Sequence, residues 1–347
     1  MSVKLSDRES PDRPAVVTGA AGWLGRNLVR ALVAQGRPVR ALVQHPDEGP
    51  LLELLSSDLS TVAGDVRDPS VLDALFVGMR DATVFHAAAV IHPKTVRDFF
   101  DTNVGGTELV VDQARRSGAA RMVHVSSNSP FGANARPTDR FTEDSPMNPY
   151  MGYGESKVEA EAIVTRANDR GDVETVIIRA PWFYGPYQPA RQSQWFKAVR
   201  RGRFPLIGDG TQQRSMVYTD HLVQGLLRAE ATPAAAGRAY WIADPEPYEL
   251  RQVLATVREA LAAEGLPVSG GQPRLPRFVG VVAERVDGFL QGRGKYLQAV
   301  HVLGELKDTI ACDITRARAE LGYDPQTTLL DGMRTSIRYC LDHGEIL

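Results

Sequence analysis

Cysteine is scarce in this sequence, as are long apolar runs and clusters of charge of one sign. The 347 residues include two cysteines, Cys312 and Cys340, which lack the spacing of a metal site. We therefore expect free thiols in a reducing cytoplasm and no metal centre. The formal net charge is −2 and no run of basic residues occurs, so electrostatics give no reason to expect nucleic acid or an anionic membrane as a partner. No apolar stretch has the length of a membrane-spanning helix.

The composition is that of a globular protein. Hydrophobic residues make up 43% and charged residues 24% of the chain, which allows a substantial core. The length suits one large α/β unit with an appendage. The first 13 residues are polar and contain no apolar segment, so we expect a disordered tail there rather than a signal peptide.

Residues 14–36 are typical of a strand, a glycine turn and a helix. The β-branched run Ala15–Thr18 enters the turn T-G-A-A-G-W-L-G, and apolar residues at helical spacing leave it. Gly19 lets the chain reverse, Gly22 lets the backbone approach a pyrophosphate, and Gly25 lets the helix pack on the strand. The free N–H groups and positive dipole end of the helix attract the phosphates. The pattern predicts dinucleotide binding.

The second predicted strand, residues 38–43, bears on the choice between NAD and NADP. In NAD-binding folds an acidic residue at the end of this strand often binds the ribose 2′-hydroxyl. Here Val43 and Gln44 take that place, and Arg40 lies within the strand. A missing carboxylate and a nearby guanidinium favour a 2′-phosphate and hence NADP(H). The alternative is that Arg40 is an ordinary surface residue of the strand.

Strands alternate with helices over about the first 180 residues, which predicts a doubly wound parallel sheet. One of these helices is expected to begin at Asn103. Beyond Arg179 the alternation stops at several prolines. We assign residues 14–180, with parts of 215–245, to a nucleotide-binding Rossmann domain. Residues 181–214 and 246–347 form a smaller α+β substrate-binding portion. An apolar stripe over Phe278–Leu290 has helical spacing and is core, pocket wall or surface.

The reactive residues are expected at the end of the fifth strand and on the helix after it. Tyr153 and Lys157 are four residues apart and share a helix face, so the ammonium is expected to lower the pKa of the phenol. A tyrosine with a lowered pKa can exchange a proton with a substrate oxygen. Ser127 ends the neighbouring strand and can bind the same oxygen as charge develops on it. We expect His86, at the end of the fourth strand, to be a packed and hydrogen-bonded side chain.

Together these residues resemble the extended short-chain dehydrogenase/reductase superfamily, over residues 14–342. The resemblance rests on the glycine turn, Asp65, H-A-A at 86–88, N-V-G-G-T at 103–107, Ser126–Ser127, Y-G-E-S-K at 153–157, Arg179, Y-G-P at 184–186 and Asp220. It implies Ser127, Tyr153 and Lys157 as the catalytic set, with Asn103 supporting their geometry. Many members form homodimers through the helices that begin here near Val104 and Gly152. The predicted cofactor contacts are Gly19, Ala21, Gly22, Trp23, Leu24, Gly25, Arg40, Asp65, Val66, Ala87, Ala88, Tyr153, Lys157 and Pro181. Asp65 either accepts from the adenine amino group or caps the next helix.

Two departures and one similarity point to a branch of the superfamily. Nucleotide-sugar epimerases usually have an asparagine where this chain has Trp182, and sugar 4,6-dehydratases have an Asp-Glu pair where it has Asn128-Ser129. R-L-P at 274–276, the apolar helix after it and residues 313–323 are instead similar to the 3β-hydroxysteroid dehydrogenase and dihydroflavonol reductase side. Trp182 either lines a pocket for a hydrophobic substrate or fills core space. Arg214 supports a nucleotide sugar, because an arginine there often contacts a diphosphate.

We therefore predict an NAD(P)-dependent oxidoreductase that interconverts a secondary alcohol and a ketone on a small, largely apolar molecule. Ser127, Trp182 and Arg214 are its predicted substrate contacts. The alternative enzyme is a nucleotide-sugar 4-epimerase that retains NAD. A third hypothesis is a cofactor-sensing regulatory protein without turnover, but such a protein has no reason to keep the Ser127, Tyr153 and Lys157 set.

Overall fold

The computed structural model describes residues 13–347 and contains a central seven-stranded sheet. Residues 1–12, which belong to the predicted tail, lie outside the described residues. All strand pairs of the sheet are parallel, and the strand order is β11-β6-β5-β4-β1-β2-β3. The strands are β1 (Ala15–Thr18), β2 (Val39–Val43), β3 (Leu59–Ala63), β4 (Thr83–His86), β5 (Arg121–Ser127), β6 (Glu174–Ala180) and β11 (Ala239–Trp241).

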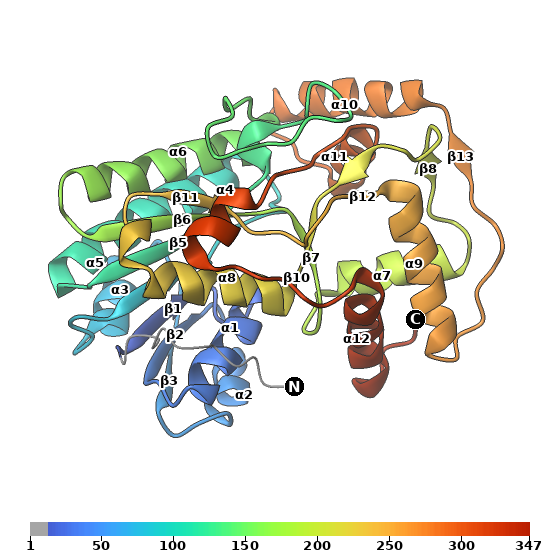
Figure 1. The fold of residues 1–347 in the computed structure, drawn as a ribbon. Helices are drawn as coiled ribbons and strands as arrows, with labels where there is room; N and C mark the ends of the chain where they lie inside the picture. Colours follow the sequence, from blue (N-terminus) through green and yellow to red (C-terminus); the bar gives the residue numbers. More distant parts are fainter. Residues whose placement is uncertain (1–12) are drawn as a thin grey trace.

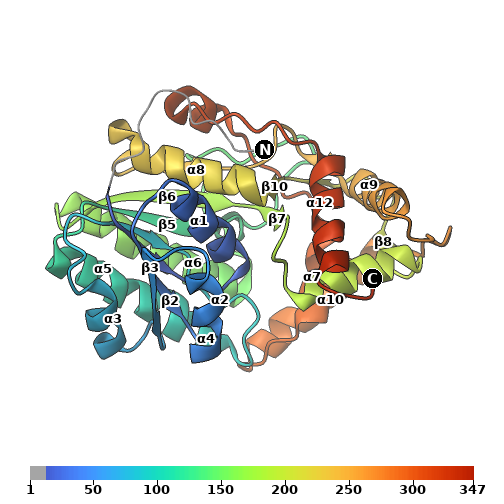
Figure 2. The ribbon, with the colours of Figure 1, turned by 90° about the horizontal axis from the view of Figure 1, so that it is seen from below.

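Helices cover both faces of this sheet (Figures 1 and 2). On one face lie α3 (Pro69–Phe76), α5 (Gly106–Ser117) and α6 (Met151–Asp169), and on the other lie α1 (Trp23–Ala34) and α8 (Thr219–Ala231). Successive strand residues pack into different cores: Val16 and Val84 join the first face, whereas Val17 and Phe85 join the second. Because helices cover both faces, the inner strands are mainly apolar, whereas the edge strand β3 is largely exposed. The predicted doubly wound α/β fold is confirmed.

The helix predicted to begin at Asn103 begins earlier in the structure. The chain is already helical in α4 (Val96–Phe99) and continues through a π-helix (Phe100–Gly105) into α5. At the start, Asp98 Oδ2 accepts a hydrogen bond from the Thr95 backbone N–H at 2.9 Å. Asn103 therefore lies inside a π-turn, a feature that often accompanies functional sites.

The chain after β6 builds a smaller part with its own apolar core, centred on residues such as Phe196, Leu254 and Met333. Three two-stranded pairs, β7 with β10, β9 with β12, and β8 with β13, hold its loops together. Its elements are β7 (Trp182–Tyr184), α7 (Ala190–Arg200), β8 (Leu206–Ile207), β9 (Gln213–Arg214), β10 (Met216–Tyr218), β12 (Tyr248–Glu249), α9 (Leu250–Ala263), β13 (Arg274–Leu275), α10 (Arg277–Gln291), α11 (Gln298–Glu305), a short π-helix (Ala317–Leu321) and α12 (Leu329–Asp342). Short helical segments at η1 (Pro46–Glu48), α2 (Gly49–Glu53), η3 (Ser129–Phe131) and η4 (Pro233–Ala235) complete the fold.

The sheet topology positions a binding crevice. From β1 the chain first adds β2 and β3 on one side of the sheet and then adds β4, β5 and β6 on the other. β1 and β4 are therefore neighbours, and the helices that follow them lie on opposite faces of the sheet. In doubly wound sheets, ligands bind at this switch point, outside the carboxyl ends of the strands. Cys312 and Cys340 are both buried and unpaired, as expected. Within residues 13–347, no helix has the length and apolar character needed to cross a membrane.

Candidate active site

A cavity of about 750 Å³ opens at the carboxyl ends of β1, β4, β5 and β6. It is lined from the sheet side by the glycine turn and by the residues that end β4, β5 and β6, and from the opposite side by α7 and α11. Among the residues predicted from the sequence, the lining includes Gly19, Gly22, Trp23, Leu24, Gly25, Ala87, Ser127, Tyr153, Lys157, Pro181, Trp182 and Arg214. Ala21, Arg40, Asp65, Val66 and Ala88 are not among the lining residues.

The glycine turn has the geometry that its sequence predicts. Gly19 has φ +69°, and a Cβ there would lie 2.8 Å from the backbone nitrogen of Ala88. A Cβ on Gly25 would lie 2.1 Å from the carbonyl oxygen of Gly19. A Cβ on Gly22 would contact only that same oxygen, at 3.1 Å. Gly19 and Gly25 are thus required by the fold itself, whereas Gly22 leaves the turn open toward an approaching ligand.

Trp23 joins the glycine turn to the smaller part of the protein. Its indole Nε1 donates hydrogen bonds to the carbonyl oxygens of Pro186, at 2.9 Å, and Gly185, at 3.3 Å. Its ring packs against Phe183 with centroids 4.7 Å apart. The first turn of α1 is therefore fixed against the segment that leaves the sheet.

Ser127, Tyr153 and Lys157 meet at one wall of the cavity. Ser127 is the last residue of β5, Tyr153 lies in the first turn of α6, and Lys157 lies one turn further along. The Ser127 hydroxyl is close enough to the Tyr153 phenol to lower its pKa. The Lys157 ammonium donates to the carbonyl oxygen of Val125 at 2.7 Å, two residues before Ser127. The structure thus brings together the three residues that the sequence assigns to catalysis.

Burial, rather than Lys157, dominates the titration of Tyr153. Burial raises the pKa of the phenol to about 12, and the Ser127 hydroxyl only partly opposes that rise. Burial also lowers the pKa of Lys157 to about 8, against the raising effect of Glu161. Lys157 is not among the groups that shift the pKa of the phenol, so the lowering predicted from the ammonium is not seen here. Tyr153 is therefore protonated at neutral pH.

Asn103 connects the π-helix to the catalytic helix. Its amide oxygen accepts from the backbone N–H of Val90 at 2.8 Å, and its amide nitrogen donates to the Val90 carbonyl at 3.1 Å. The same nitrogen donates to Ser156 Oγ at 3.0 Å, and Ser156 Oγ donates to the carbonyl of Tyr153 at 2.8 Å. Asn103 is a positioning residue, since its bonds orient both the wall after β4 and the first turn of α6.

A buried ion pair anchors the other side of the catalytic helix. Glu161, on α6, accepts from Arg179 Nη2 at 2.8 Å and from Ser126 Oγ at 2.5 Å. Arg179 and Glu161 are both almost fully buried. The Arg179 guanidinium also lies over the Phe131 ring, 4.6 Å from its centroid. This cluster ties α6 to the carboxyl ends of β5 and β6, next to Ser127.

His86 is a structural hydrogen-bonding residue, as predicted. Thr107 Oγ1 donates to the Asn103 carbonyl at 2.6 Å, so in its 3.0 Å contact with His86 Nε2 it is the acceptor. His86 Nδ1 then accepts from Thr18 Oγ1 at 2.7 Å, and Thr18 Oγ1 accepts from the Ala88 N–H at 3.2 Å. Burial lowers the pKa of His86 to about 3, which keeps this neutral tautomer.

Three predicted nucleotide contacts have other partners in the structure. The Arg40 guanidinium donates to the carbonyl of Val77, which follows the C-terminus of α3. The Asp65 carboxylate is paired with Arg67, at 2.6 Å and 2.9 Å, and is 42% exposed. Asp68, not Asp65, caps α3 by accepting from the backbone N–H of Ser70. Val66 packs below Gly106. The structure does not bring Arg40 to the glycine turn.

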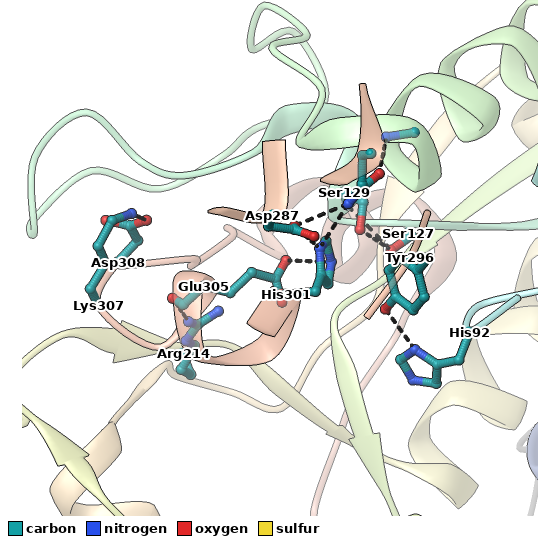
Figure 3. Close-up of polar contacts among 12 residues, drawn as sticks. His92, Ser127, Ser129, Arg214, Asp287, Tyr296, His301, Glu305, Lys307 and Asp308 are labelled. Atoms are coloured by element: carbon teal, nitrogen blue, oxygen red, sulfur yellow. Dashed lines mark hydrogen bonds and ion pairs between the residues drawn. The ribbon is translucent and has the colours of Figure 1, made fainter. Parts of the chain in front are cut away.

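The cavity is also lined by polar residues that the sequence reasoning missed, His92, Tyr296 and His301 among them (Figure 3). His301 Nδ1 lies 2.7 Å from Oδ2 of Asp287, whose side chain is fully buried. Burial lowers the pKa of His301, but the hydrogen bond to Asp287 and the charge of Glu305 outweigh it and raise the pKa. His92 Nδ1 lies 2.9 Å from the Tyr296 hydroxyl, and burial lowers the pKa of His92 to about 4. No local motif marks these residues: His92 is 204 positions from Tyr296, and Asp287 and His301 lie on two different helices.

The arrangement fits a nicotinamide dinucleotide. The glycine turn leaves a backbone cradle at the N-terminus of α1, where free N–H groups favour phosphates. From this cradle the cavity continues past Ala87 to Lys157 and Tyr153. No group of histidine, cysteine, aspartate and glutamate that could hold a metal ion occurs within residues 13–347. The fold and site are those of a nicotinamide-dependent oxidoreductase of the extended short-chain type.

Comparison with known proteins gives the family. The model of the NAD dependent epimerase/dehydratase family matches residues 15–243. The chain belongs to this family. It is 32% identical over 327 residues to the 4-hydroxy-2-methyl-3-oxo-4-farnesyl-3,4-dihydroquinoline-1-oxide ketoreductase of Stigmatella aurantiaca, covering 91% of this chain and 93% of the relative. It is 29% identical to the 3 beta-hydroxysteroid dehydrogenase/Delta 5-->4-isomerase of Mycobacterium tuberculosis, covering 93% and 89%.

A solved structure shares the fold. The UDP-glucuronic acid 4-epimerase of Bacillus cereus, in complex with UDP-glucuronic acid and NAD, superimposes with a TM-score of 0.75 at 22% identity. The superposition covers 95% of this chain and 99% of that chain. The predicted resemblance to the extended short-chain dehydrogenases is thereby confirmed, and the chain is an NAD-dependent oxidoreductase of that type.

Proposed function

We propose that the protein interconverts a secondary alcohol and a ketone on a small, largely apolar substrate. The observation that carries this proposal is the meeting of Ser127, Tyr153 and Lys157 at one wall of a cavity whose remaining walls are mainly apolar. Trp182 and Trp195 stack there with ring centroids 5.0 Å apart. Phe204, Val302, Leu306 and Ile310 extend the apolar lining. Two relatives named for a ketoreductase and a steroid dehydrogenase support the same reading.

The roles of the three residues follow from their hydrogen bonds. The nicotinamide, when bound, supplies or accepts the hydride. Ser127 Oγ accepts from the Ser129 N–H at 3.2 Å and lies 3.3 Å from Ser129 Oγ. With a substrate bound, the Ser127 hydroxyl would donate its proton to the carbonyl oxygen of that substrate. Tyr153, whose pKa is about 12, donates the proton that converts the developing alkoxide to an alcohol. Lys157 holds a positive charge beneath this wall and is placed to bind the nicotinamide ribose.

For the nucleotide, two observations favour NAD(H) over the NADP(H) that the sequence suggested. Arg40, the residue behind that preference, is bound to the Val77 carbonyl. A carboxylate that the sequence argument missed lies directly after β2: Glu48 Oε2 accepts from the backbone N–H groups of Gln44 and His45, at 3.0 Å each. A negative charge there opposes a 2′-phosphate and suits a ribose 2′-hydroxyl.

The alternative, a nucleotide-sugar 4-epimerase, has one observation in its favour. Arg214 is buried and lines the cavity, so it could meet a diphosphate. Its guanidinium is, however, already bound to the carbonyl of Glu305. Trp182 occupies the place where such epimerases usually carry asparagine. A small, largely apolar alcohol or ketone therefore suits the lining of the cavity better than a sugar nucleotide does.

One experiment separates these hypotheses. Purified protein is incubated with NAD+ and dehydroepiandrosterone as an apolar 3β-hydroxy probe, and in parallel with UDP-glucose. We expect reduced nicotinamide with the apolar alcohol and no UDP-galactose. Formation of UDP-galactose without net reduction of NAD+ would establish the epimerase instead. Loss of turnover in Tyr153→Phe, with unchanged NAD+ binding, would exclude a protein that only senses the cofactor.

Three further predictions belong to this proposal. The sheet part, residues 14–180 with parts of 215–245, binds the nucleotide, and residues 181–214 with 246–347 bind the substrate. The protein acts in the cytoplasm. It forms a homodimer through α5 and α6, which pack side by side and carry the half-buried apolar residues Leu109 and Ile163. Sedimentation equilibrium of the wild type and of Leu109→Glu tests the dimer.

A further inference from the structure

The outer face of α10 carries bulky apolar side chains. Phe278, Val282, Val286 and Phe289 recur at spacings of four, four and three residues, so they lie on one side of the helix. Their exposed fractions are 65%, 52%, 43% and 58%. Leu297, just beyond the helix, is 51% exposed. Figure 1 shows α10 along the edge of the molecule, with α11 on its inner side. The stripe seen in the sequence is therefore surface, and neither core nor pocket wall.

The inner face of the same helix is built from small and polar residues. Its buried positions are Gly280, Ala283, Asp287 and Gln291. A Cβ on Gly280 would lie 2.8 Å from the Cβ of Lys307, so the helix packs closely there. Asp287 accepts from Gln291 Nε2 at 3.0 Å, and Gln291 Oε1 accepts from the backbone N–H of Gly152 at 3.2 Å. α10 thus buries its small and polar side chains and exposes its bulky apolar ones, which is the reverse of an ordinary surface helix. Its apolar face does not hold it on the protein and is available to a partner.

The exposed charges around this face are positive. Five cations are exposed there: Arg274, Arg277, Arg285, Arg293 and Lys295. Of the two carboxylates of the same segment, Asp287 is buried, and Glu284, whose side chain is 37% exposed, is paired with the Lys307 ammonium at 3.1 Å. The whole chain has a net charge of −2, so the positive charge is local to this surface. The sequence argument against an anionic membrane used the overall charge and could not detect this concentration.

We propose that α10 docks the protein on an anionic lipid surface. The apolar face would enter the boundary between headgroups and acyl chains, and the cations would lie over the lipid phosphates, as in interfacial amphipathic helices. Charge complementarity selects this partner over a second copy of the chain. Two copies joined through this face would bring five cations against five cations, which disfavours association.

Docking would bring the substrate cavity close to apolar molecules dissolved in the membrane. α11 packs on α10 and contributes Gln298, His301 and Val302 to the cavity lining. The two helices therefore separate the proposed lipid surface from the cavity. This consequence for substrate supply rests on the proposed function, whereas docking itself does not.

Co-sedimentation with vesicles tests the proposal on the full chain. One set of vesicles contains phosphatidylglycerol and phosphatidylcholine in equal parts, and the other contains phosphatidylcholine alone. We expect binding to the anionic vesicles that weakens with salt, and at least a tenfold lower partition coefficient for Phe278→Ser with Phe289→Ser. Leu51→Ser with Leu54→Ser is the matched control, because these leucines are 65% and 83% exposed on another surface. The control pair should bind as the wild type does.

Several outcomes would overturn the proposal. Wild-type protein that stays in the supernatant with anionic vesicles would do so, as would unchanged binding of the Phe278→Ser, Phe289→Ser variant. A wild-type oligomer that this variant dissociates in sedimentation equilibrium, without vesicle binding, would assign the face to a second copy. Equal melting temperatures of wild type and both double variants ensure that a change reports the surface rather than the fold. Activity is not part of the readout, so the proposed function can fail while docking stands.

Discussion

Replacing Arg179 by methionine tests how the catalytic helix is held. In the native protein the guanidinium makes hydrogen bonds of 2.8 and 3.3 Å to Glu161 and donates to the Glu143 carbonyl at 3.0 Å. Methionine keeps most of the apolar contact with Phe131 but removes the charge. Glu161, whose side chain is 3% exposed, would then retain Ser126 as its remaining hydrogen-bond donor.

A buried carboxylate that loses its cation costs about 3–5 kcal/mol. We therefore expect Arg179→Met to lower the free energy of unfolding by about that amount. Glu161→Gln keeps an acceptor for Ser126 and for one guanidinium N–H, so it should cost about 1–2 kcal/mol. The double variant Arg179→Met, Glu161→Met leaves no unpaired buried charge. It should be more stable than Arg179→Met alone, because apolar residues can replace a buried ion pair at little cost.

Urea unfolding followed by tryptophan fluorescence measures these differences, since the Trp241 ring lies 6.0 Å from the Arg179 guanidinium. The midpoint shift at constant m-value gives the change in stability. A cost below about 1 kcal/mol for Arg179→Met, or a double variant less stable than Arg179→Met, would refute the reasoning. In that case the pair would be solvated, and the anchoring of α6 would need another explanation.

Three more predictions follow from the site. Gly22→Ala should fold normally but bind NAD+ at least tenfold more weakly, a loss of about 1.4 kcal/mol in binding free energy. Gly25→Ala should instead lower the melting temperature, because its Cβ would overlap a backbone oxygen at 2.1 Å. Calorimetric titration with NAD+ and thermal melts distinguish the two variants. Glu48→Gln should raise the ratio of NADP+ to NAD+ affinity at least tenfold, while Arg40→Ala leaves that ratio unchanged, and the opposite pattern would restore NADP(H). The rate of alcohol oxidation should rise from neutral to alkaline pH, because the phenol of Tyr153, with a pKa of about 12, must first lose its proton. The rate of ketone reduction should not rise over the same range. Equal pH profiles for the two directions would contradict this assignment.

The sequence was most informative where local patterns decide the structure. The apolar runs of β1, β2, β4, β5 and β6 are buried on both faces, and short helices separate them, so the parallel sheet could be predicted. The glycine turn was equally predictable, because Gly19 and Gly25 answer steric requirements of the chain itself. The spacing of Tyr153 and Lys157 and the strand that ends in Ser127 likewise predicted that these three residues would line one cavity.

The sequence was less informative where side chains from distant segments meet. It could not show that Arg40 would extend to the Val77 carbonyl, or that Glu48 would place its carboxylate after β2. It also could not show that burial would govern the pKa of Tyr153, because burial depends on tertiary contacts such as that with the Phe99 ring, 5.6 Å away. The pairing of His301 with Asp287 joins two helices through a tertiary contact and leaves no local motif.

The measurement that tests the central claim most directly is reduction of NAD+ by wild type and Tyr153→Phe in the presence of apolar secondary alcohols, dehydroepiandrosterone among them. The account predicts reduced nicotinamide and the corresponding ketone with the wild type. It predicts at least a hundredfold lower rate for Tyr153→Phe at unchanged NAD+ affinity, within the range attributed to a general acid–base. A Tyr153→Phe enzyme that oxidises the same alcohol at the wild-type rate would contradict the assignment of proton transfer to Tyr153.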